Sequence, residues 1–161
     1  MQIAEYISPE RVVVGSKAGS KKRALEILSA LIAGAHPGLV ETAIFDCLLA
    51  RERLGSTGIG HGIAIPHGRL DSVDRPIGAF AVLEKGVDFD ALDGEPVDLM
   101  CALVVPAEST EEHLQILSSL ATRFSDERFR DRLRRCATAE ELYTLLAGDE
   151  VAPRRQAAAP S

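Results

Sequence analysis

The stretch STGIGHGIAIPHG, residues 56–68, marks the middle of this chain of 161 residues. Four of its thirteen residues are glycine, which indicates unusual backbone angles and a close approach of the main chain to another group. Residues 63–65 have the composition of a buried strand, and Pro66, His67 and Gly68 follow directly. The stretch therefore predicts a glycine-rich loop, a short strand, and a histidine on a stiff support at the end of that strand.

Further strands are predicted on both sides of this stretch. Residues 76–83 and 97–105 are rich in Val, Ala, Leu and Phe, which is typical of strands buried on both faces. Between them, Asp93 and Gly94 form a turn signal that favours a hairpin. Nearer the N-terminus, residues 11–15 (RVVVG) form a short β-branched run, which we interpret as another strand.

Helical patterns enclose these strands along the sequence. Apolar residues recur at helical spacing over residues 21–33, after a Ser20 cap, and over residues 40–54, before a Gly55 stop. Behind the strands, three more helices are predicted over residues 110–124, over 127–136, and from a capping box at Thr138 and Glu141 to just before Gly148. Ser109 and Glu112 predict a capping box for the first of these three. This order of elements predicts an α/β sandwich with a mixed β-sheet.

Length and hydropathy limit the organisation of the chain. The length favours one domain, which we expect over residues 1–148. Residues 149–161 show no periodicity and are expected to form a disordered C-terminal tail. The longest apolar run, residues 99–106, is much shorter than the roughly 20 residues of a spanning helix, so we expect no membrane insertion.

The charge and the cysteine content argue against two further classes of protein, nucleic-acid binders and disulfide-rich proteins. The chain has 24 acidic and 18 basic residues, a net charge of −6, which is unfavourable for a nucleic-acid binder. We interpret its one basic stretch, residues 128–135, as a solvated helix face. The three cysteines, Cys47, Cys101 and Cys136, are odd in number and far apart. They do not suggest a disulfide framework, and we expect a reducing, cytoplasmic location.

Three residues are candidates for chemistry, each with a plainer alternative. His67 could be a neutral nucleophile at a strand end, or a histidine that only caps a strand edge. His113 lies near a predicted helix N-terminus, where anions bind, or is a surface residue. Arg51 precedes the glycine-rich stretch and could reach an anion, or only marks a helix end. Taken together, the three residues suggest phosphate chemistry on histidine.

A metal-dependent hydrolase is the rival interpretation. His61, His67 and His113 could bind a metal together with Asp71 or Asp74. However, the sequence contains no HxH, HExxH or CxxC spacing. We therefore expect no metal. The glycine-rich stretch is not a nucleotide-binding P-loop either, because no Gly-Lys-Ser/Thr follows it.

Four stretches of the chain resemble a known family. They are RERLGSTGIGHGIAIPHGRL (51–70), FDALDGEPVDLMCALVVPAE (89–108), HLQILSSLATRF (113–124) and AEELYTLL (139–146). They resemble the enzyme IIA proteins of the bacterial phosphotransferase system (PTS), of the fructose/mannitol type, and within it the nitrogen-regulatory branch. The resemblance implies a mixed β-sheet flanked by helices on both faces, which agrees with the pattern of elements above.

The resemblance also implies roles for individual residues. His67 matches the histidine that accepts the phosphoryl group on Nε2, and His113 and Arg51 match residues that contact this group and stabilise its charge. Thr57 and the glycines of the loop, Gly58, Gly60 and Gly62, would line the site. His61 departs from the family pattern, in which a small polar residue is expected, and this could alter the pH response or the metal affinity of the loop.

The function implied is that of a regulatory phosphocarrier. A small histidine phosphocarrier protein of the HPr type, itself charged by a phosphoenolpyruvate-dependent enzyme I, would donate the phosphoryl group, and the phosphorylation state would be the signal to regulatory targets. No cofactor and no metal are expected. One alternative is a IIA component that passes phosphate to a separate sugar-specific IIB subunit. Another is a non-catalytic binding module with the same fold.

Overall fold

A six-stranded sheet forms the middle layer of the computed structural model, which describes residues 2–148. Its strands follow the order β1-β5-β6-β3-β2, and β4 also pairs with β6. The pairs β2–β3 and β5–β6 are antiparallel and the others are parallel, so the sheet is mixed, as predicted. The strand bounds are β1 Val12–Ser16, β2 Gly58–Gly60, β3 Ile63–Ala64, β4 His67–Arg69, β5 Ile77–Val87 and β6 Val97–Val105.

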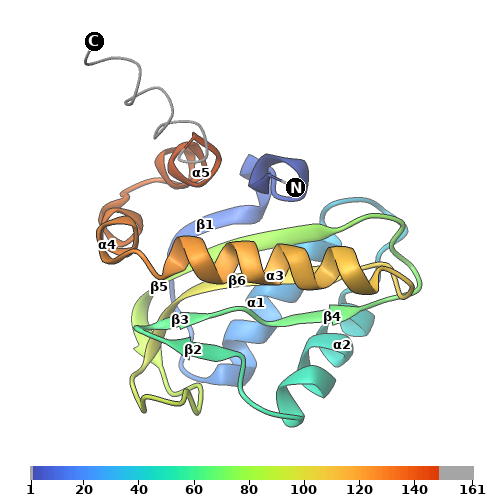
Figure 1. Ribbon diagram of the computed structural model, residues 1–161, viewed down its shortest axis with the longest axis horizontal. Helices are drawn as coiled ribbons and strands as arrows, with labels where there is room; N and C mark the ends of the chain where they lie inside the picture. The colour runs from blue at the N-terminus through green and yellow to red at the C-terminus, as the bar shows by residue number, and fades with distance from the viewer. Residues whose placement is uncertain (1, 149–161) are drawn as a thin grey trace.

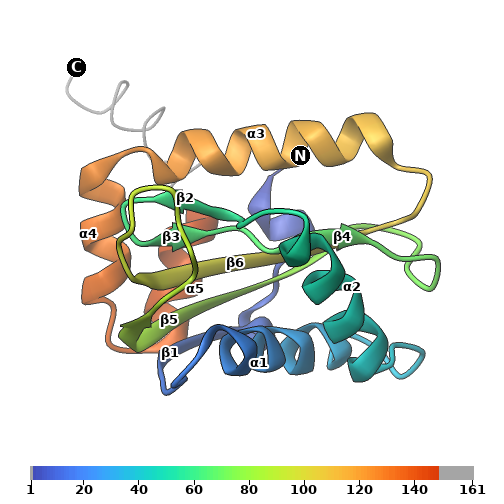
Figure 2. The ribbon, with the colours of Figure 1, turned by 90° about the horizontal axis from the view of Figure 1, so that it is seen from below.

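Helices cover both faces of this sheet, which confirms the predicted α/β architecture. Figure 2 shows the sheet between α3 on one side and the pair α1 and α2 on the other. The α4 and α5 helices lie at one end of the face that α3 covers (Figure 1). The helix bounds are α1 Lys21–Ala33, α2 Glu41–Arg53, α3 Thr110–Phe124, α4 Glu127–Arg135 and α5 Ala139–Gly148.

The two faces of β6 explain why residues 99–105 of this strand are all apolar. Met100 and Val104 are buried in the core under α1 and α2, whereas Leu99 and Leu103 are buried in the core under α3, α4 and α5. A strand that is covered on both faces loses the alternation of polar and apolar residues. Two short 3-10 helices, Ile3–Glu5 and Pro9–Arg11, precede β1, and Ile3 adds to the second core.

Two of the three predicted caps are confirmed and one is wrong. Ser20 accepts the N–H of Arg23 at 3.1 Å, and Thr138 and Glu141 exchange the two hydrogen bonds of a capping box. Ser109 makes no side-chain hydrogen bond to the start of α3. Its ψ of 72° lies outside the extended range that aims an N-cap oxygen at the first turn.

The basic stretch on α4 is less solvated than predicted. Arg130 is buried and donates from Nη1 to the carbonyl of Phe124 at 2.9 Å, and Arg134 pairs with Asp98 at 3.0 Å. These two side chains attach α4 to the rest of the domain. The interpretation as a solvated face therefore fails for Arg130 and Arg134.

The short strand β4 decides where His67 points. In its parallel pairing with β6, His67 lies opposite Leu103 and Gly68 lies opposite Val104. Because paired residues share a face of a sheet, His67 lies on the face of α3 and Gly68 on the face of α2. A side chain on Gly68 would collide with the sulfur of Cys47 on α2, so the sheet and this helix approach closely here.

No helix within residues 2–148 is both long and apolar enough to cross a lipid bilayer. The segment predicted to be a disordered tail, residues 149–161, lies outside the residues that the structure describes.

Candidate active site

His67 is held in one tautomer by the main chain. Its Nδ1 lies 2.7 Å from the carbonyl oxygen of Ile65. A carbonyl can only accept, so Nδ1 carries the proton and Nε2 keeps a lone pair. Pro66, between these two residues, is fixed because its carbonyl accepts the N–H of Leu103 at 2.9 Å. The backbone of β4 therefore orients an imidazole whose nucleophilic nitrogen is Nε2.

Burial lowers the pKa of His67. The loss of hydration is the largest cause, and the positive charge of Arg51 acts in the same direction. The hydrogen bond to Ile65 and the carboxylate of Glu52 oppose this shift, but the pKa still lies below its usual 6.5. His67 is therefore neutral at pH 7, which is the state in which it can attack an electrophile.

His113 faces His67 from the first turns of α3. The two ring centroids are 5.3 Å apart, and the ring planes meet at 78°. Burial lowers the pKa of His113 to about 4, and His67 and Arg69 contribute to the same shift. Its Nε2 is buried and has no hydrogen-bond partner within residues 2–148. Such an atom is costly to bury, so an unpaired one beside a nucleophile indicates a place for a ligand.

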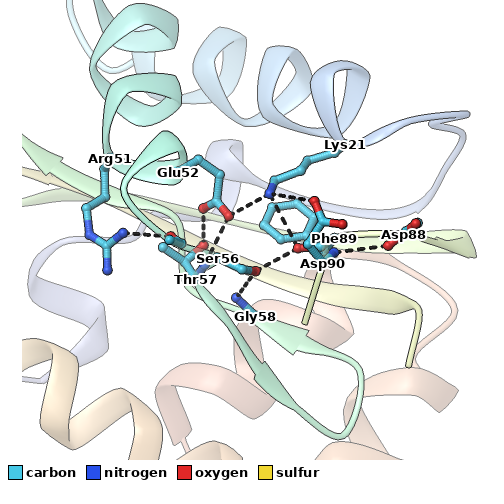
Figure 3. Close-up of polar contacts among 10 residues, drawn as sticks. Lys21, Arg51, Glu52, Ser56, Thr57, Gly58, Asp88, Phe89 and Asp90 are labelled. Carbon is cyan, nitrogen blue, oxygen red and sulfur yellow. Dashed lines mark hydrogen bonds and ion pairs between the residues drawn. The ribbon is translucent and has the colours of Figure 1, made fainter. Parts of the chain in front are cut away.

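Arg51 supplies positive charge from the end of α2. Its Nη1 donates to the carbonyl of Gly55 at 2.8 Å, which holds the side chain across the loop that follows the helix (Figure 3). A guanidinium has five N–H donors in a planar fork that matches a phosphate or a carboxylate. One donor to Gly55 leaves others for an anion.

These three residues line one cleft of about 700 Å³ between α2, β4 and α3, which we call the histidine cleft. Arg69 and Thr110 also line it and are joined by a hydrogen bond of 3.2 Å. Part of the wall is apolar, and at its mouth Leu54 is 85% exposed and Leu114 is 63% exposed. The cleft therefore combines two imidazoles and two guanidinium groups with one carboxylate, that of Asp46, and an apolar rim.

The structure does not bring the predicted loop residues to the lining of the histidine cleft. Thr57 is buried and bonded to Glu52, and a side chain on Gly58 would collide with Ala91. Gly60 and Gly62 have positive φ angles of 99° and 79°, which glycine adopts without strain. They turn the chain from β2 into β3.

His61 lies on the same turn with a φ of 59°, and it lines a different pocket, together with Gly62, Asp98 and Arg134. We call this the acidic pocket, because Asp93, Glu95, Glu127 and Asp131 also line it. The backbone N–H of His61 donates to Asp93 at 2.9 Å. Among residues 2–148, no group of three His, Cys, Asp or Glu side chains is placed to hold a metal ion.

Glu52 and Arg69 belong to this region and are not evident from the sequence. Glu52 stands between two arginines at a helix end, a pattern typical of a solvated surface, yet only 5% of it is exposed. Its partner Lys21 lies 31 positions earlier, so no local spacing reveals the pair. Arg69 could have been found from its position two residues after His67, because alternate residues of a strand share a face.

The fold and the histidine cleft together define a class of α/β domain that holds a neutral imidazole beside guanidinium groups. A model of one family matches residues 5–148, and its description is "Phosphoenolpyruvate-dependent sugar phosphotransferase system, EIIA 2". The chain belongs to this family, whose members are phosphotransfer components. The family resemblance stated for residues 51–70 is thereby confirmed.

Individual relatives are similar over most of their length. A "Nitrogen regulatory protein" of Pseudomonas aeruginosa is 47% identical over 146 residues, 91% of this chain and 95% of the relative. The crystal structure of nitrogen regulatory protein IIA-Ntr from Neisseria meningitidis aligns with a TM-score of 0.84 at 43% identity, over 89% of this chain and 98% of that one. The IIA mannitol structure from Escherichia coli aligns with a TM-score of 0.74 at 26% identity, over 87% and 98%.

Proposed function

We propose that this chain is a regulatory phosphocarrier that accepts a phosphoryl group on Nε2 of His67. One observation carries the proposal: the carbonyl of Ile65 holds the proton on Nδ1, so that Nε2 is the nucleophile in a cleft with His113 and Arg51. The donor is the phosphohistidine of a small phosphocarrier protein, which an enzyme I charges from phosphoenolpyruvate. The chain itself needs no metal or cofactor for this step.

The transfer exchanges one phosphorus–nitrogen bond for another. The lone pair of His67 Nε2 forms the new bond to phosphorus, and the electron pair of the broken bond returns to the imidazole of the donor. No proton is consumed, and the step is close to isoenergetic because both bonds are of one kind. Catalysis of such a step is mostly positioning and charge stabilisation.

Two side chains stabilise the charge on the phosphoryl oxygens. Arg51 offers the donors that Gly55 does not use, and His113 donates from Nε2 when its proton resides there. This gives the buried Nε2 of His113 the partner that it lacks within residues 2–148. Both groups act from the two helices that enclose His67.

The phosphorylation state is the signal in this proposal. A phosphoryl group adds up to about two negative charges at the mouth of a cationic cleft, which is sufficient to change the affinity of a partner. Leu54 and Leu114 give protein partners an apolar contact around the reacting group. A regulatory role is supported by the 47% identity to a protein named for nitrogen regulation.

A cytoplasmic location follows from the donor, and the cysteines agree with it. Cys47, Cys101 and Cys136 are free thiols, and burial raises the pKa of each. Thiols of this kind suit a reducing compartment.

A second candidate function is that of a sugar-specific IIA component that passes its phosphoryl group to a separate IIB subunit. The likeness to the IIA mannitol structure supports it. The two functions share the first step and differ in the second. Phosphorylated chain that transfers its label to a purified mannitol- or fructose-specific IIB domain supports the second candidate. Label that remains on this chain supports the regulatory one.

The proposed function is tested by intact-protein mass spectrometry. The chain is incubated with phosphoenolpyruvate, enzyme I and the small phosphocarrier, next to its His67→Ala variant. We expect one acid-labile phosphoryl group on the wild type and none on the variant. An unlabelled wild type in the presence of a competent carrier would instead indicate a binding module that has lost transfer.

A further inference from the structure

An ion pair with a buried carboxylate lies at the end of α2, next to Arg51. The side chain of Glu52 is 1% exposed, and its Oε1 lies 2.9 Å from the Nζ of Lys21 at the start of α1. Burying a carboxylate costs several kcal/mol, and an ion pair repays this only when further hydrogen bonds complete it. An apolar pair is as stable in many proteins, so stability alone is a weak reason for this carboxylate, and its other partners are informative.

The remaining hydrogen bonds of Glu52 go to the loop that leaves α2. Its carboxylate accepts the backbone N–H of Thr57 at 3.0 Å, and the Thr57 hydroxyl donates to the other oxygen. Figure 3 shows this carboxylate between Lys21 and Thr57, while Arg51 points to the opposite side of the helix end. One side chain thus connects the last turn of α2 to the loop five residues later.

The same loop holds Arg51. Its Gly55 carbonyl accepts from the Arg51 guanidinium at 2.8 Å, and Gly55 is only two residues before Thr57. The bonds of Glu52 to Thr57 therefore restrict the short loop segment that carries the Gly55 carbonyl. Glu52 does not line the histidine cleft, so it influences an anion there only through Arg51 and through its charge.

Lys21 anchors this arrangement to two further segments. Its Nζ lies 3.4 Å from the carbonyl oxygen of Phe89, 4.6 Å from the centre of the Phe89 ring, and 3.7 Å from Asp90. The hydroxyl of Ser56 donates to the same Phe89 carbonyl at 2.6 Å. The loop is thereby held from α2, from α1 and from the segment after β5.

We propose that Glu52, held by Lys21, is a positioning residue for phosphoryl transfer: it fixes the loop at Gly55–Thr57 and so holds the Arg51 guanidinium at the histidine cleft. The inference rests on the proposed function and adds to it a residue that does not touch the reacting atoms. A misplacement of about 1 Å at such a group can slow a reaction by roughly 100-fold.

The test is a single-turnover measurement of phosphoryl transfer from the phosphorylated carrier to the wild type and to Glu52→Gln. Glu26→Gln is the matched control, because Glu26 makes an exposed ion pair on α1 with Arg23 at 3.4 Å. We expect Glu52→Gln to lower the rate constant at saturating carrier roughly 10- to 100-fold, with little change in the carrier concentration that gives half saturation. Glu26→Gln should retain the wild-type rate.

The amplitude and the rate constant of phosphoryl transfer together distinguish a positioning role of Glu52 from a role in folding. A merely structural role would lower the fraction of chain that becomes labelled and would leave the rate constant of the folded fraction unchanged. The double variant Arg51→Ala/Glu52→Gln tests the route through Arg51: it should be no slower than Arg51→Ala alone, because the two changes remove one function.

One further variant keeps the inference falsifiable if Glu52→Gln does not fold. Thr57→Val keeps the ion pair and removes only the hydroxyl bond to the loop, and we expect it to lower the rate constant as well. Where Glu52→Gln folds, NMR titration should show a lower His67 pKa, because the Glu52 carboxylate favours protonation there. The other charged or titratable groups that line the cleft with His67 are Asp46, Cys47 and Arg51 on α2, His113 on α3 and Arg69 on β4, and all remain.

The outcomes distinguish this inference from the proposed function. No label on the wild type overturns both. A labelled wild type with equally fast transfer to Glu52→Gln, or to Thr57→Val where only that variant folds, overturns the positioning role alone. Additive slowing in the double variant overturns the route through Arg51.

Discussion

Two depressions at opposite ends of this domain are built from the same kinds of side chain. The histidine cleft contains His67, His113 and Arg51, and the acidic pocket contains His61 and Arg134. In the acidic pocket, Arg134 donates to Asp98 at 3.0–3.2 Å and to the carbonyl of His61 at 2.7 Å. In the histidine cleft, Nε2 of His113 has no partner within the described residues.

The two depressions differ in which of their hydrogen-bond donors and acceptors already have partners in the fold. In the acidic pocket, the Arg134 guanidinium attaches α4 to the turn between β2 and β3 and to Asp98, so its donors serve the fold, and His61 takes part through its backbone N–H and carbonyl. In the histidine cleft, the one main-chain bond to His67 selects a tautomer and leaves its reactive nitrogen open. Residue type alone does not locate a site; the remaining hydrogen-bonding capacity does.

The largest expected effect comes from replacing one histidine of each depression by alanine and comparing the two variants. His67→Ala should abolish phosphoryl acceptance, because no other imidazole within residues 2–148 has a main-chain bond that exposes Nε2 beside a guanidinium. His61→Ala should be labelled to the wild-type extent. Intact mass after incubation with the phosphorylated carrier measures both, and label that survives in His67→Ala would mean that another histidine is the acceptor.

Replacing Arg51 should affect mainly the transfer activity, whereas replacing Arg134 should affect mainly the stability. Arg51→Ala should slow phosphoryl transfer roughly 100- to 1,000-fold, as loss of one charge-stabilising donor does. Arg134→Ala should retain the transfer rate and lower the free energy of unfolding by about 1–3 kcal/mol, because Asp98 loses charged hydrogen bonds. Stopped-flow kinetics and urea denaturation measure the two effects. Equal slowing of phosphoryl transfer by both variants would contradict the difference between the histidine cleft and the acidic pocket.

The histidine cleft should also make stability depend on pH. The pKa of His113 is about 4 in the folded chain against 6.5 when unperturbed, so the unfolded chain binds more protons between these values. Stability contributed by neutral His113 is therefore complete above pH 6.5 and is lost as the pH falls towards 4, by up to about 3 kcal/mol. The lowered pKa of His67 acts in the same direction.

Urea denaturation of the wild type and of His113→Gln over this range checks the prediction. The variant cannot protonate at this position, so its unfolding free energy should fall less steeply with decreasing pH. Parallel curves for the two proteins would show that burial of His113 is not the cause.

The smallest effect is expected from the turn at the acidic pocket. Gly62→Ala would place a methyl group against the guanidinium of Arg134 at a φ of 79°, and we expect a loss of about 2 kcal/mol in unfolding free energy. Gly94→Ala is the matched control: its φ is 73°, with open space around it, so it should cost about 1 kcal/mol from strain alone. Transfer to His67 should be unchanged in both, and thermal denaturation compares them.

The sequence alone was sufficient to predict the α/β architecture. The long helices and the two long strands have strong periodicity or long apolar runs, and α1, α2 and β6 lie within one residue of their predicted bounds. The short strands β2 and β4 were not predicted, because two or three residues rich in glycine carry no periodic signal. Strand β5 runs on to Val87 through the exposed residues 84–86, whose polarity had suggested an end at 83.

The histidines and the arginine of the site were predicted, but the contacts that hold them in place were not. His67, His113 and Arg51 were brought together by a family resemblance and by their chemistry, and the structure places them in one cleft. The tautomer of His67 and the buried pairing of Glu52 with Lys21 depend on tertiary contacts. No spacing in a single sequence reports which carbonyl a ring nitrogen meets or which helix covers a carboxylate.

The central claim, that the open Nε2 of His67 is the acceptor, is tested most directly by NMR of the phosphorylated chain with ¹⁵N-labelled histidine. We expect one phosphoryl group, bonded to Nε2 of His67, with the proton still on Nδ1 and the signals of His61 and His113 free of a phosphorus coupling. A phosphoryl group on Nδ1 of His67, or on either of the other two histidines, would contradict it.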